Sequence, residues 1–296
     1  MRIGYPCLNL SLDCKSSRTF RLKNYSESRL IETVENNLKC LKKILVYNRK
    51  HNLLFFRITS DLVPFGSHPI LKYNWQEHFR EKFEEIGKFI KESKMRITMH
   101  PGQYTVLNSN KQKVFENAIN DLEYHIDILD LMDLNPTAKA QIHVGGVYGD
   151  KEKSLQRFIK RYHNLNSKIK KRLIIENDEK SYTLEDCMKI HRETDIPVVF
   201  DTFHHECNNN GESINTAFQI FTKTWRKNGL PIIHYSTQHP IKGNYSHAEN
   251  IDLDHFKNFL QKTKQFDFDI MLEIKNKEKS ALKAVELLKL DKRFNT

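Results

Sequence analysis

Eight short apolar segments alternate with longer amphipathic stretches along this chain of 296 residues, and this alternation constrains its fold more than any other feature. Apolar runs without a polar face are typical of parallel strands that are buried on both sides. We expect strands at Arg2–Asn9, Leu53–Thr59, Arg96–His100, Ala140–Val144, Leu173–Asn177, Pro197–Asp201, Ile232–Tyr235 and Ile270–Ile274.

The longer stretches place apolar side chains at helical spacing, as Leu30, Val34 and Leu38 show in the first of them. Ser154 and Thr183 stand where helix N-caps belong. We expect helices at Ser28–Arg49, Trp75–Lys91, Val114–Met132, Leu155–Ile169, Leu184–Glu193, Ser213–Arg226, Leu253–Lys264 and Ala281–Leu288.

Eight strand–helix units in a chain of this length predict an α/β fold, a single (β/α)8 TIM barrel that spans residues 1–296. A doubly wound open sheet is the second possibility. The sequence lacks the GxGxxG fingerprint that would favour it. No linker or longer repeat indicates a second domain.

The formal net charge is +11. A polyanionic partner accounts for this charge, because neutralised phosphates release counterions. A lysine-rich surface that serves only solubility accounts for it equally well, so charge alone does not decide between the two.

The five cysteines are odd in number and form no CxxC pair. We therefore expect reduced thiols in a cytoplasmic protein rather than a disulfide framework or a zinc knuckle. No apolar signal precedes the first strand, and no apolar run approaches the ~20 residues of a membrane-spanning helix. Six histidines on the predicted helices are expected at the surface: His51, His78, His125, His163, His191 and His255.

The ends of the predicted strands carry the residues of chemical interest, because active sites of barrels lie at the C-terminal ends of the strands. Six successive strands, the third to the eighth, end in His, Asp or Glu, and two further histidines follow in loops. In chain order these residues are His100, His143, Glu176, Asp201, His204, His234, His247 and Glu273.

Taken singly, each of these residues has a plain structural explanation, such as a hydrogen-bonded core histidine or an Asp201 that caps the next helix. Together, several carboxylates at one barrel mouth would repel one another and would be costly to desolvate, and bound divalent metals remove both problems. There are too many ligands for one tetrahedral site, so two or three metals are expected. Imidazole with carboxylate suits Zn²⁺ or Mn²⁺, and such clusters catalyse phosphoryl displacement.

Two segments lack metal ligands but are of interest, one with Gln103 and Tyr104 and one with Tyr5. Gln103 and Tyr104 follow His100, and an amide beside an aromatic ring on an exposed loop can wedge into a base stack. From composition alone, an ordinary loop is the better explanation. Tyr5 either stacks on a base or fills the barrel, and His68 lies near the end of the loop at residues 61–68.

These residues match a known family along nearly the whole chain: the sequence resembles UV damage endonucleases of the UvdE or UvsE type. The matching motifs are Gly4-Tyr5-Pro6 with Asn9, Phe56-Arg57-Ile58-Thr59-Ser60-Asp61-Leu62-Val63-Pro64-Phe65, His100-Pro101-Gly102-Gln103-Tyr104, His143-Val144-Gly145-Gly146, Glu176-Asn177-Asp178, Asp201-Thr202-Phe203-His204-His205, His234-Tyr235-Ser236 and Glu273-Ile274-Lys275.

The resemblance implies a TIM barrel related to endonuclease IV that nicks damaged double-stranded DNA immediately 5′ of UV photoproducts, and often of abasic sites. The products carry a 3′-hydroxyl and a 5′-phosphate. It implies two or three divalent metals, with Mn²⁺ expected first and Zn²⁺, Mg²⁺ or Co²⁺ as alternatives. The chain is expected to act as a monomer without an obligate protein partner, associating with the nucleoid when bound to DNA.

The resemblance also assigns roles to residues. It makes metal ligands of the eight strand-end and loop residues named above. We assign catalytic roles to Glu176, Glu273, His234 and Lys275. Contacts to DNA or the lesion are assigned to Tyr5, Asn9, Arg57, His68, Gln103 and Tyr104.

One position departs from the family pattern. The family has a lysine two residues before the strand-seven histidine, and this lysine can be carboxylated near the metals. Ile232 stands there in this chain, so a carboxylated lysine at that place is impossible. Lys275 is the candidate substitute.

Three other functions remain open: an abasic-site endonuclease of the endonuclease IV type, a metal-dependent sugar isomerase or epimerase on a related barrel, and a DNA-binding barrel without activity. The number of histidine ligands and the net charge of +11 disfavour the sugar enzymes. The dense ligand set disfavours a protein without activity.

Overall fold

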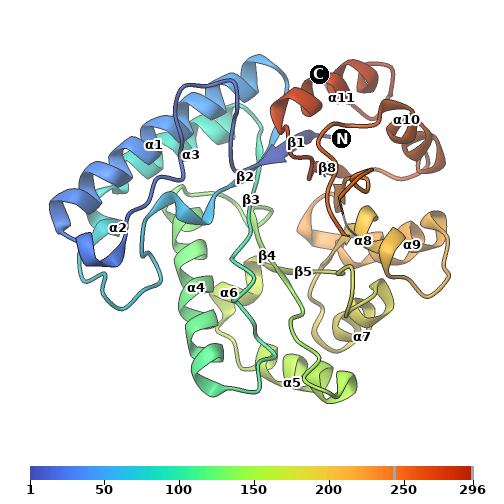
Figure 1. Cartoon of the computed structure of the whole chain (residues 1–296), viewed down its shortest axis with the longest axis horizontal. Coiled ribbons are helices and arrows are strands. Elements are labelled where there is room, and N and C mark those ends of the chain that lie inside the picture. Colours follow the sequence, from blue (N-terminus) through green and yellow to red (C-terminus); the bar gives the residue numbers. More distant parts are fainter. Residues whose placement is uncertain (243–244, 295–296) are drawn as a thin grey trace.

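Eight parallel strands close into a barrel in the computed structural model, which describes residues 1–242 and 245–294 (Figure 1). Ile3 of the first strand pairs with Ile270 of the last, so the sheet has no open edge. The predicted (β/α)8 barrel is confirmed, and the open sheet is excluded. The strands are β1 Ile3–Pro6, β2 Phe55–Ile58, β3 Arg96–Met99, β4 Lys139–His143, β5 Leu173–Glu176, β6 Val198–Asp201, β7 Ile232–Tyr235 and β8 Asp269–Leu272.

Helices surround the barrel: α1 Glu27–Lys50, α2 Trp75–His78, α3 Arg80–Glu92, α4 Gln112–Leu131, α5 Lys151–His163, α6 Ser167–Arg172, α7 Leu184–Thr194, α8 Thr202–Cys207, α9 Ile214–Phe221, α10 Leu253–Lys262 and α11 Glu278–Leu288. The structure divides two predicted helices, into α2 with α3 and α5 with α6. It also adds the short α8 directly after β6. None of the described helices is long and apolar enough to cross a membrane.

Both faces of the strands are covered, which explains why the strands read as apolar runs. Ile174 and Ile175 in β5 are neighbours on opposite faces and are both fully buried. The strands also carry a few buried polar side chains, which lie inside the barrel. Arg96 Nη1 lies 2.8 Å from Asp269 Oδ2 at the ends where β3 and β8 begin, and the metal candidates lie at the opposite ends.

Of the two predicted N-caps, one is confirmed and one is wrong. Thr183 caps α7 and shares a capping box with Asp186, whose carboxylate accepts the Thr183 backbone N–H. Ser154 lies inside α5 instead, and Asp150 is the N-cap because its side chain accepts the N–H of Lys153. Ser154 Oγ donates to the carbonyl of Val147, 2.6 Å away.

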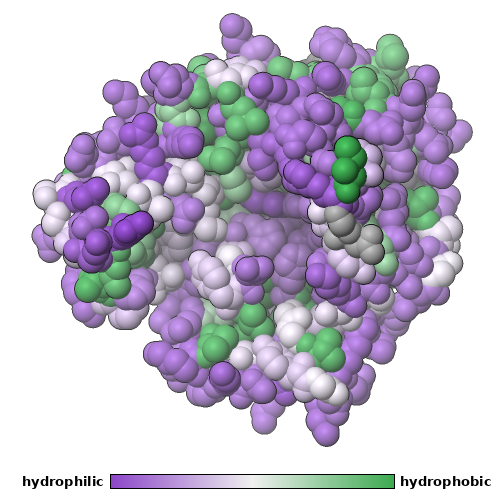
Figure 2. All heavy atoms as spheres, viewed as in Figure 1, coloured by the Kyte–Doolittle hydropathy of each residue, from purple (hydrophilic) through white to green (hydrophobic). Residues whose placement is uncertain are grey.

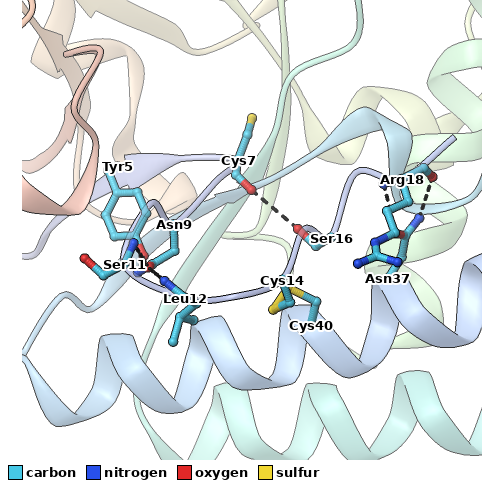
Figure 3. Close-up of a disulfide and its surroundings, with 10 residues drawn as sticks. All are labelled: Tyr5, Cys7, Asn9, Ser11, Leu12, Cys14, Ser16, Arg18, Asn37 and Cys40. Carbon is cyan, nitrogen blue, oxygen red and sulfur yellow. Dashed lines mark hydrogen bonds between the residues drawn. A yellow bond between two sulfur atoms is a disulfide. The ribbon is translucent and has the colours of Figure 1, made fainter.

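Cys14 and Cys40 form a disulfide, so the expectation of reduced thiols throughout is wrong for this pair. The bond ties the loop after β1 to α1 (Figure 3). Asn37 on the same helix also holds this loop, because its side chain accepts from the backbone of Arg18 and donates back to it. Spacing along the sequence does not reveal such a pairing, since it depends on how the loop lies over the helix.

The expectation that all six helix-borne histidines lie at the surface is wrong for His125, which is fully buried in α4. Its Nδ1 donates to the carbonyl of Asp121, 2.6 Å away, and its Nε2 lies 3.0 Å from Ser60 Oγ. Burial lowers the pKa of His125. Ser60 in turn donates to the carbonyl of His100, so His125 helps to brace the loop that carries a metal candidate.

The thiol count tests the disulfide directly. Denatured, unreduced protein should show only the three free thiols of Cys7, Cys187 and Cys207 in a titration with Ellman's reagent. Reduced protein should show five. Cys14→Ser with Cys40→Ser should lower the free energy of unfolding in urea by about 3 kcal/mol, because the cross-link no longer restricts the unfolded chain. Cys207→Ser, at an exposed free cysteine, should change stability little. Five thiols in unreduced protein would rule the bond out.

Candidate metal centre at the barrel mouth

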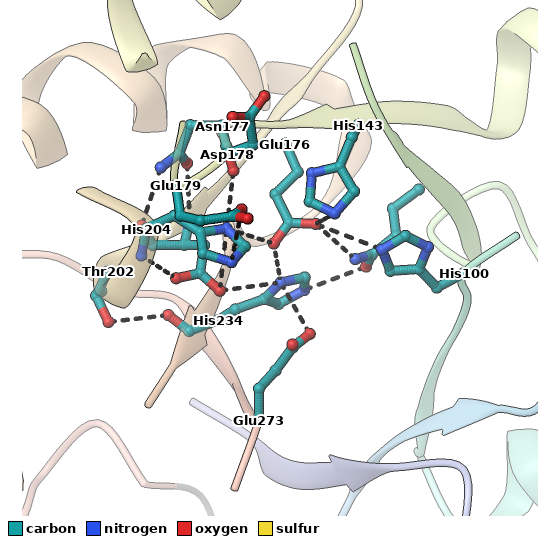
Figure 4. Close-up of polar contacts among 12 residues, drawn as sticks. His100, His143, Glu176, Asn177, Asp178, Glu179, Thr202, His204, His234 and Glu273 are labelled. Atoms are coloured by element: carbon teal, nitrogen blue, oxygen red, sulfur yellow. Dashed lines mark hydrogen bonds and ion pairs between the residues drawn. The ribbon is translucent and has the colours of Figure 1, made fainter. Parts of the chain in front are cut away.

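The C-terminal ends of six neighbouring strands bring the metal candidates together (Figure 4). His143, Glu176 and Asp201 are the last residues of β4, β5 and β6, and His100 and Glu273 directly follow β3 and β8. The strands are parallel, so these ends meet at the same rim. Figure 2, in the view of Figure 1, shows the molecule hollowed near its centre, with hydrophilic residues around the hollow.

The first group of possible metal ligands consists of His100, His143 and Glu176, whose ligand atoms all lie within 4.8 Å of one another. Glu176 Oε2 is 3.7 Å from His100 Nε2 and 3.8 Å from His143 Nε2. His100 Nδ1 donates to the carbonyl of Pro101, which leaves the Nε2 lone pair facing the group. His143 Nδ1 is buried and has no hydrogen-bond partner.

The second group consists of Glu176, Asp201, His234 and Glu273, also within 4.8 Å of one another. His234 Nδ1 lies 2.6 Å from Glu176 Oε1 and 3.2 Å from Glu273 Oε1. Asp201 Oδ2 is buried and accepts no hydrogen bond, which is costly without a cation. Glu176 therefore belongs to both groups and turns one oxygen toward each, as a carboxylate that bridges two metals would.

His204 and His247 belong to neither group but lie beside each other, with ring centroids 6.0 Å apart, and His204 Nδ1 lies 3.7 Å from Asp201 Oδ2. His204 Nδ1 donates to the carbonyl of Asn177, and its Nε2 lies 3.8 Å from Glu179 Oε2. His247 Nδ1 is buried and has no hydrogen-bond partner. The sequence did not single out Glu179. Its position three residues after Glu176, at the same strand end, is the signal that would have found it.

Asp201 performs two tasks. Its Oδ1 accepts the backbone N–H of His204 at 2.7 Å and so caps α8, while Oδ2 faces the second ligand group. The capping explanation is confirmed, and it is compatible with the metal explanation because the cap uses only one oxygen of Asp201. Because α8 begins at this cap, the cap also fixes where His204 lies.

Arg57 does not lie at the surface but inside the barrel mouth, where it is 5% exposed. Its Nη1 lies 2.7 Å from Glu273 Oε1 and its Nη2 lies 2.9 Å from His234 Nε2. A side chain held in this way positions two metal candidates. Gln141, which the sequence did not single out, has a similar task, because its Nε2 donates to Glu176 Oε2.

The electrostatics of the centre are those of a cation site. Burial alone would raise the pKa of Glu176, but His234 and His143 bring it well below the usual value. Burial also opposes the ionised form of Glu273, which Arg57 and His234 restore. The pKa of Asp201 is raised by burial and by its carboxylate neighbours. Burial would lower the pKa of His204, but Asp201 and Glu176 raise it to about 9. The carboxylates that raise the pKa values of Asp201 and His204 supply negative charge that favours divalent cations.

The residues assigned to lesion contacts divide into two sets. Gln103, Tyr104 and His68 are exposed on the loops after β3 and β2, and Tyr104 is 69% exposed. Tyr5 is fully buried, and its hydroxyl donates to Asn48 Oδ1 and accepts from Asn9 Nδ2. Tyr5 therefore fills the barrel, which is the simpler of its two explanations. The hydrogen bond from Asn9 to its hydroxyl ties the loop after β1 to this buried ring.

Neither Ile232 nor Lys275 supplies a carboxylated lysine at the ligand groups. Ile232 is the first residue of β7 and is fully buried. Lys275 is exposed, and its backbone N–H donates to the carbonyl of Ala248. Lys277 is closer in its electrostatics to the ligand groups. Burial lowers its pKa, and its charge interacts with Glu273 and Arg57.

Comparison with known proteins gives consistent results over the whole chain. The family model described as UV-endonuclease UvdE matches residues 1–295. The UV DNA damage endonuclease of Clostridium perfringens (strain 13 / Type A) is 40% identical over 300 residues, which cover 100% of this chain and 73% of the relative.

Two solved structures complete the comparison. The crystal structure of SacUVDE superposes with a TM-score of 0.94 at 46% identity and covers 98% of both chains. Endonuclease IV from Thermus thermophilus superposes with a TM-score of 0.59 over 84% of this chain and 93% of that one. At 14% identity the second likeness concerns the fold alone.

Metal content tests the shared position of Glu176. Protein loaded with Mn²⁺ and dialysed should lose about two equivalents of metal per chain in Glu176→Gln, against about one in His100→Ala, because Glu176 serves both groups. Elemental analysis by mass spectrometry measures this content. His78→Ala, at an exposed histidine on α2, serves as the control and should bind as the wild type does. Equal losses in Glu176→Gln and His100→Ala would contradict a bridging carboxylate.

Proposed function

The chain belongs to the UV-endonuclease UvdE family and is a DNA-cleaving enzyme, and from this premise we propose that it nicks the backbone immediately 5′ of UV photoproducts. The nick leaves a 3′-hydroxyl and a 5′-phosphate, and abasic sites are a second substrate. The observation that carries the proposal is the carboxylate of Glu176, which two groups of metal ligands share at the barrel mouth.

The residues present fit divalent metals. The buried Oδ2 of Asp201 has no hydrogen-bond partner, and imidazole with carboxylate oxygen is a donor set that Mn²⁺ and Zn²⁺ accept. We propose two or three ions, with Mn²⁺ first. Bound there, such ions polarise the scissile phosphate and lower the pKa of a bound water.

The residues of the chain prepare this chemistry. Glu176 and Glu273 supply negative charge, and Arg57 fixes Glu273 and His234 in one orientation through contacts of 2.7 and 2.9 Å. His100 and His204 each donate through Nδ1 to a backbone carbonyl, which keeps the Nε2 atoms free for ligation. A ligand set held in this way costs little reorganisation when the phosphate arrives.

Recognition of damage is assigned to the loop after β3. Tyr104 is exposed, and its ring lies over Gly102, where an added Cβ would come within 2.5 Å of it. Gln103 lies beside it at the mouth. We propose that this pair enters the base stack at the lesion, where unstacking costs least, and that His68 on the β2 loop contacts the same DNA. The net charge of +11 supports binding to the phosphates.

The alternative functions have less support. A sugar isomerase or epimerase draws only on likeness of fold, since D-psicose 3-epimerase from Clostridium cellulolyticum H10 is 13% identical. A protein without activity is excluded by the family. An endonuclease restricted to abasic sites is the closest competitor, and competition between lesions separates it from the proposal.

A plasmid nicking assay tests the activity. With Mn²⁺ present, the wild type should convert UV-irradiated supercoiled plasmid to open circles and should leave undamaged plasmid intact, and EDTA should stop the reaction. Glu176→Gln should lower the rate by more than about 100-fold, since loss of even an outer partner of a metal ligand costs roughly 10- to 100-fold. Equal nicking of both plasmids, or none with Mn²⁺, refutes the proposal.

A second assay separates recognition from chemistry. Gln103→Ala combined with Tyr104→Ala should weaken binding to a duplex with one photoproduct by roughly 5- to 100-fold, the loss of one stacked base. Metal content and affinity for undamaged duplex serve as controls, and both should stay at wild-type values. Full-rate nicking of irradiated DNA by the double variant would mean that these side chains do not probe the lesion.

A further inference from the structure

A cavity of about 420 Å³ opens in the barrel mouth between the loops that follow β3, β4 and β5. It adjoins the first ligand group, because His100 and His143 line it. Gln103 and Tyr148 line it as well. The proposed endonuclease function assigns no role to the cavity or to Tyr148.

The loop after β4 holds the cavity in a fixed shape. Asn108 clamps this loop: its Nδ2 donates to the carbonyl of Gly146, and the N–H of Gly146 donates back to its Oδ1. The buried Tyr182 donates to the same carbonyl. Gly145 has a φ of +115°, and a Cβ there would lie 2.3 Å from Asn108 Oδ1. The cavity is therefore preformed, because its walls depend on buried hydrogen bonds.

Tyr148 occupies a conformation that its residue type rarely adopts. Its φ is +51°, in the left-handed region, and its side chain is 44% exposed. The ring is held from two sides: a Cβ on Gly146 would come within 2.8 Å of it, and the guanidinium of Arg157 lies 5.4 Å from its centroid. Arg157 itself is anchored, since its Nε donates to the carbonyl of Asn108. Backbone strain that fixes an exposed aromatic ring beside a reactive centre indicates a function.

The acidic side chains that line the cavity are already engaged. Asp178 accepts the backbone N–H groups of residues 180–182. Glu179 lies 3.6 Å from Lys180 Nζ and 3.8 Å from His204 Nε2. These contacts hold both carboxylates in place, and the ammonium of Lys180 offsets the charge of Glu179.

We propose that this cavity is a subsite for a nucleobase next to the scissile phosphate and that Tyr148 is the surface on which this base stacks. The proposal rests on the proposed endonuclease function. A nucleobase suits the site because it offers a flat face to the phenol ring of Tyr148, which lines the cavity. The base must also be joined to the phosphate that the neighbouring ligand group addresses, and a base of the cut strand meets this requirement.

Stacking on Tyr148 differs from the wedge assigned to Gln103 and Tyr104. The wedge fills the gap that a displaced lesion leaves, whereas Tyr148 holds a base that is still attached to the strand at the cut. Stacking on an aromatic ring tolerates every base, because each has a π-face. A subsite of this kind aligns the backbone at the metals without imposing sequence preference.

Kinetics of three variants test the proposal on a duplex with one defined photoproduct. Tyr148→Ala should raise KM for nicking by roughly 5- to 100-fold, the loss of one stacked base, with a smaller effect on kcat. Tyr148→Phe keeps the ring and should restore KM. His78→Ala is the control, because His78 is exposed on α2 and does not line the cavity. Thermal melting verifies that each variant folds.

A spectroscopic measurement reports stacking without cleavage. Nicked product duplexes carry 2-aminopurine on one side of the nick or the other. Wild type and Tyr148→Phe should quench the fluorescence of one of the two probes, and Tyr148→Ala should leave that probe bright. The subsite is refuted if neither probe is quenched, if Tyr148→Ala nicks with the wild-type KM, or if Tyr148→Ala and His78→Ala raise KM equally. Failure of the wild type to nick irradiated DNA would instead refute the proposed function, and the fluorescence would still decide the subsite.

Discussion

The buried carboxylate of Glu176 is the constraint on which the rest of the centre depends. One of its oxygens lies 2.6 Å from His234, and the other lies 3.7 and 3.8 Å from His100 and His143. Glu176 is 1% exposed, so its charge needs compensation by positive charge or hydrogen-bond donors. Burial of an uncompensated carboxylate costs several kcal/mol. The histidines and Gln141 supply part of this compensation. Divalent cations held by the remaining ligand atoms of the two groups would complete it.

The barrel makes this arrangement possible through the register of its strands. His143 in β4 pairs with Glu176 in β5, and Asp201 in β6 pairs with His234 in β7. Neighbouring positions in a parallel sheet lie close enough to share an ion, and closure of the sheet brings Glu273 to the same rim. Arg57 then orients Glu273 and His234 from inside, so the fold sets the ligand geometry before any metal binds.

The proposed chemistry and the proposed recognition of DNA belong to different parts of the mouth. The strand ends hold the ligands on a rigid frame, which suits a centre that must not rearrange during reaction. The loops present the exposed side chains: Gln103 and Tyr104 after β3, and Tyr148 after β4. The loop after β4 is both rigid and exposed. Buried hydrogen bonds from Asn108 and Tyr182 hold its backbone, while the loop displays the ring of Tyr148.

By itself the sequence determined the barrel and the strand ends that carry Glu176, Asp201 and Glu273, because strand and helix periods are local patterns along the chain. Only the tertiary structure decided what covers each residue. It paired Cys14 with Cys40, buried His125 and Tyr5 and turned Arg57 inward, which could not be predicted because these outcomes depend on contacts between segments distant in sequence. The same reason kept Tyr148 from notice, since only folding places it beside the metal candidates.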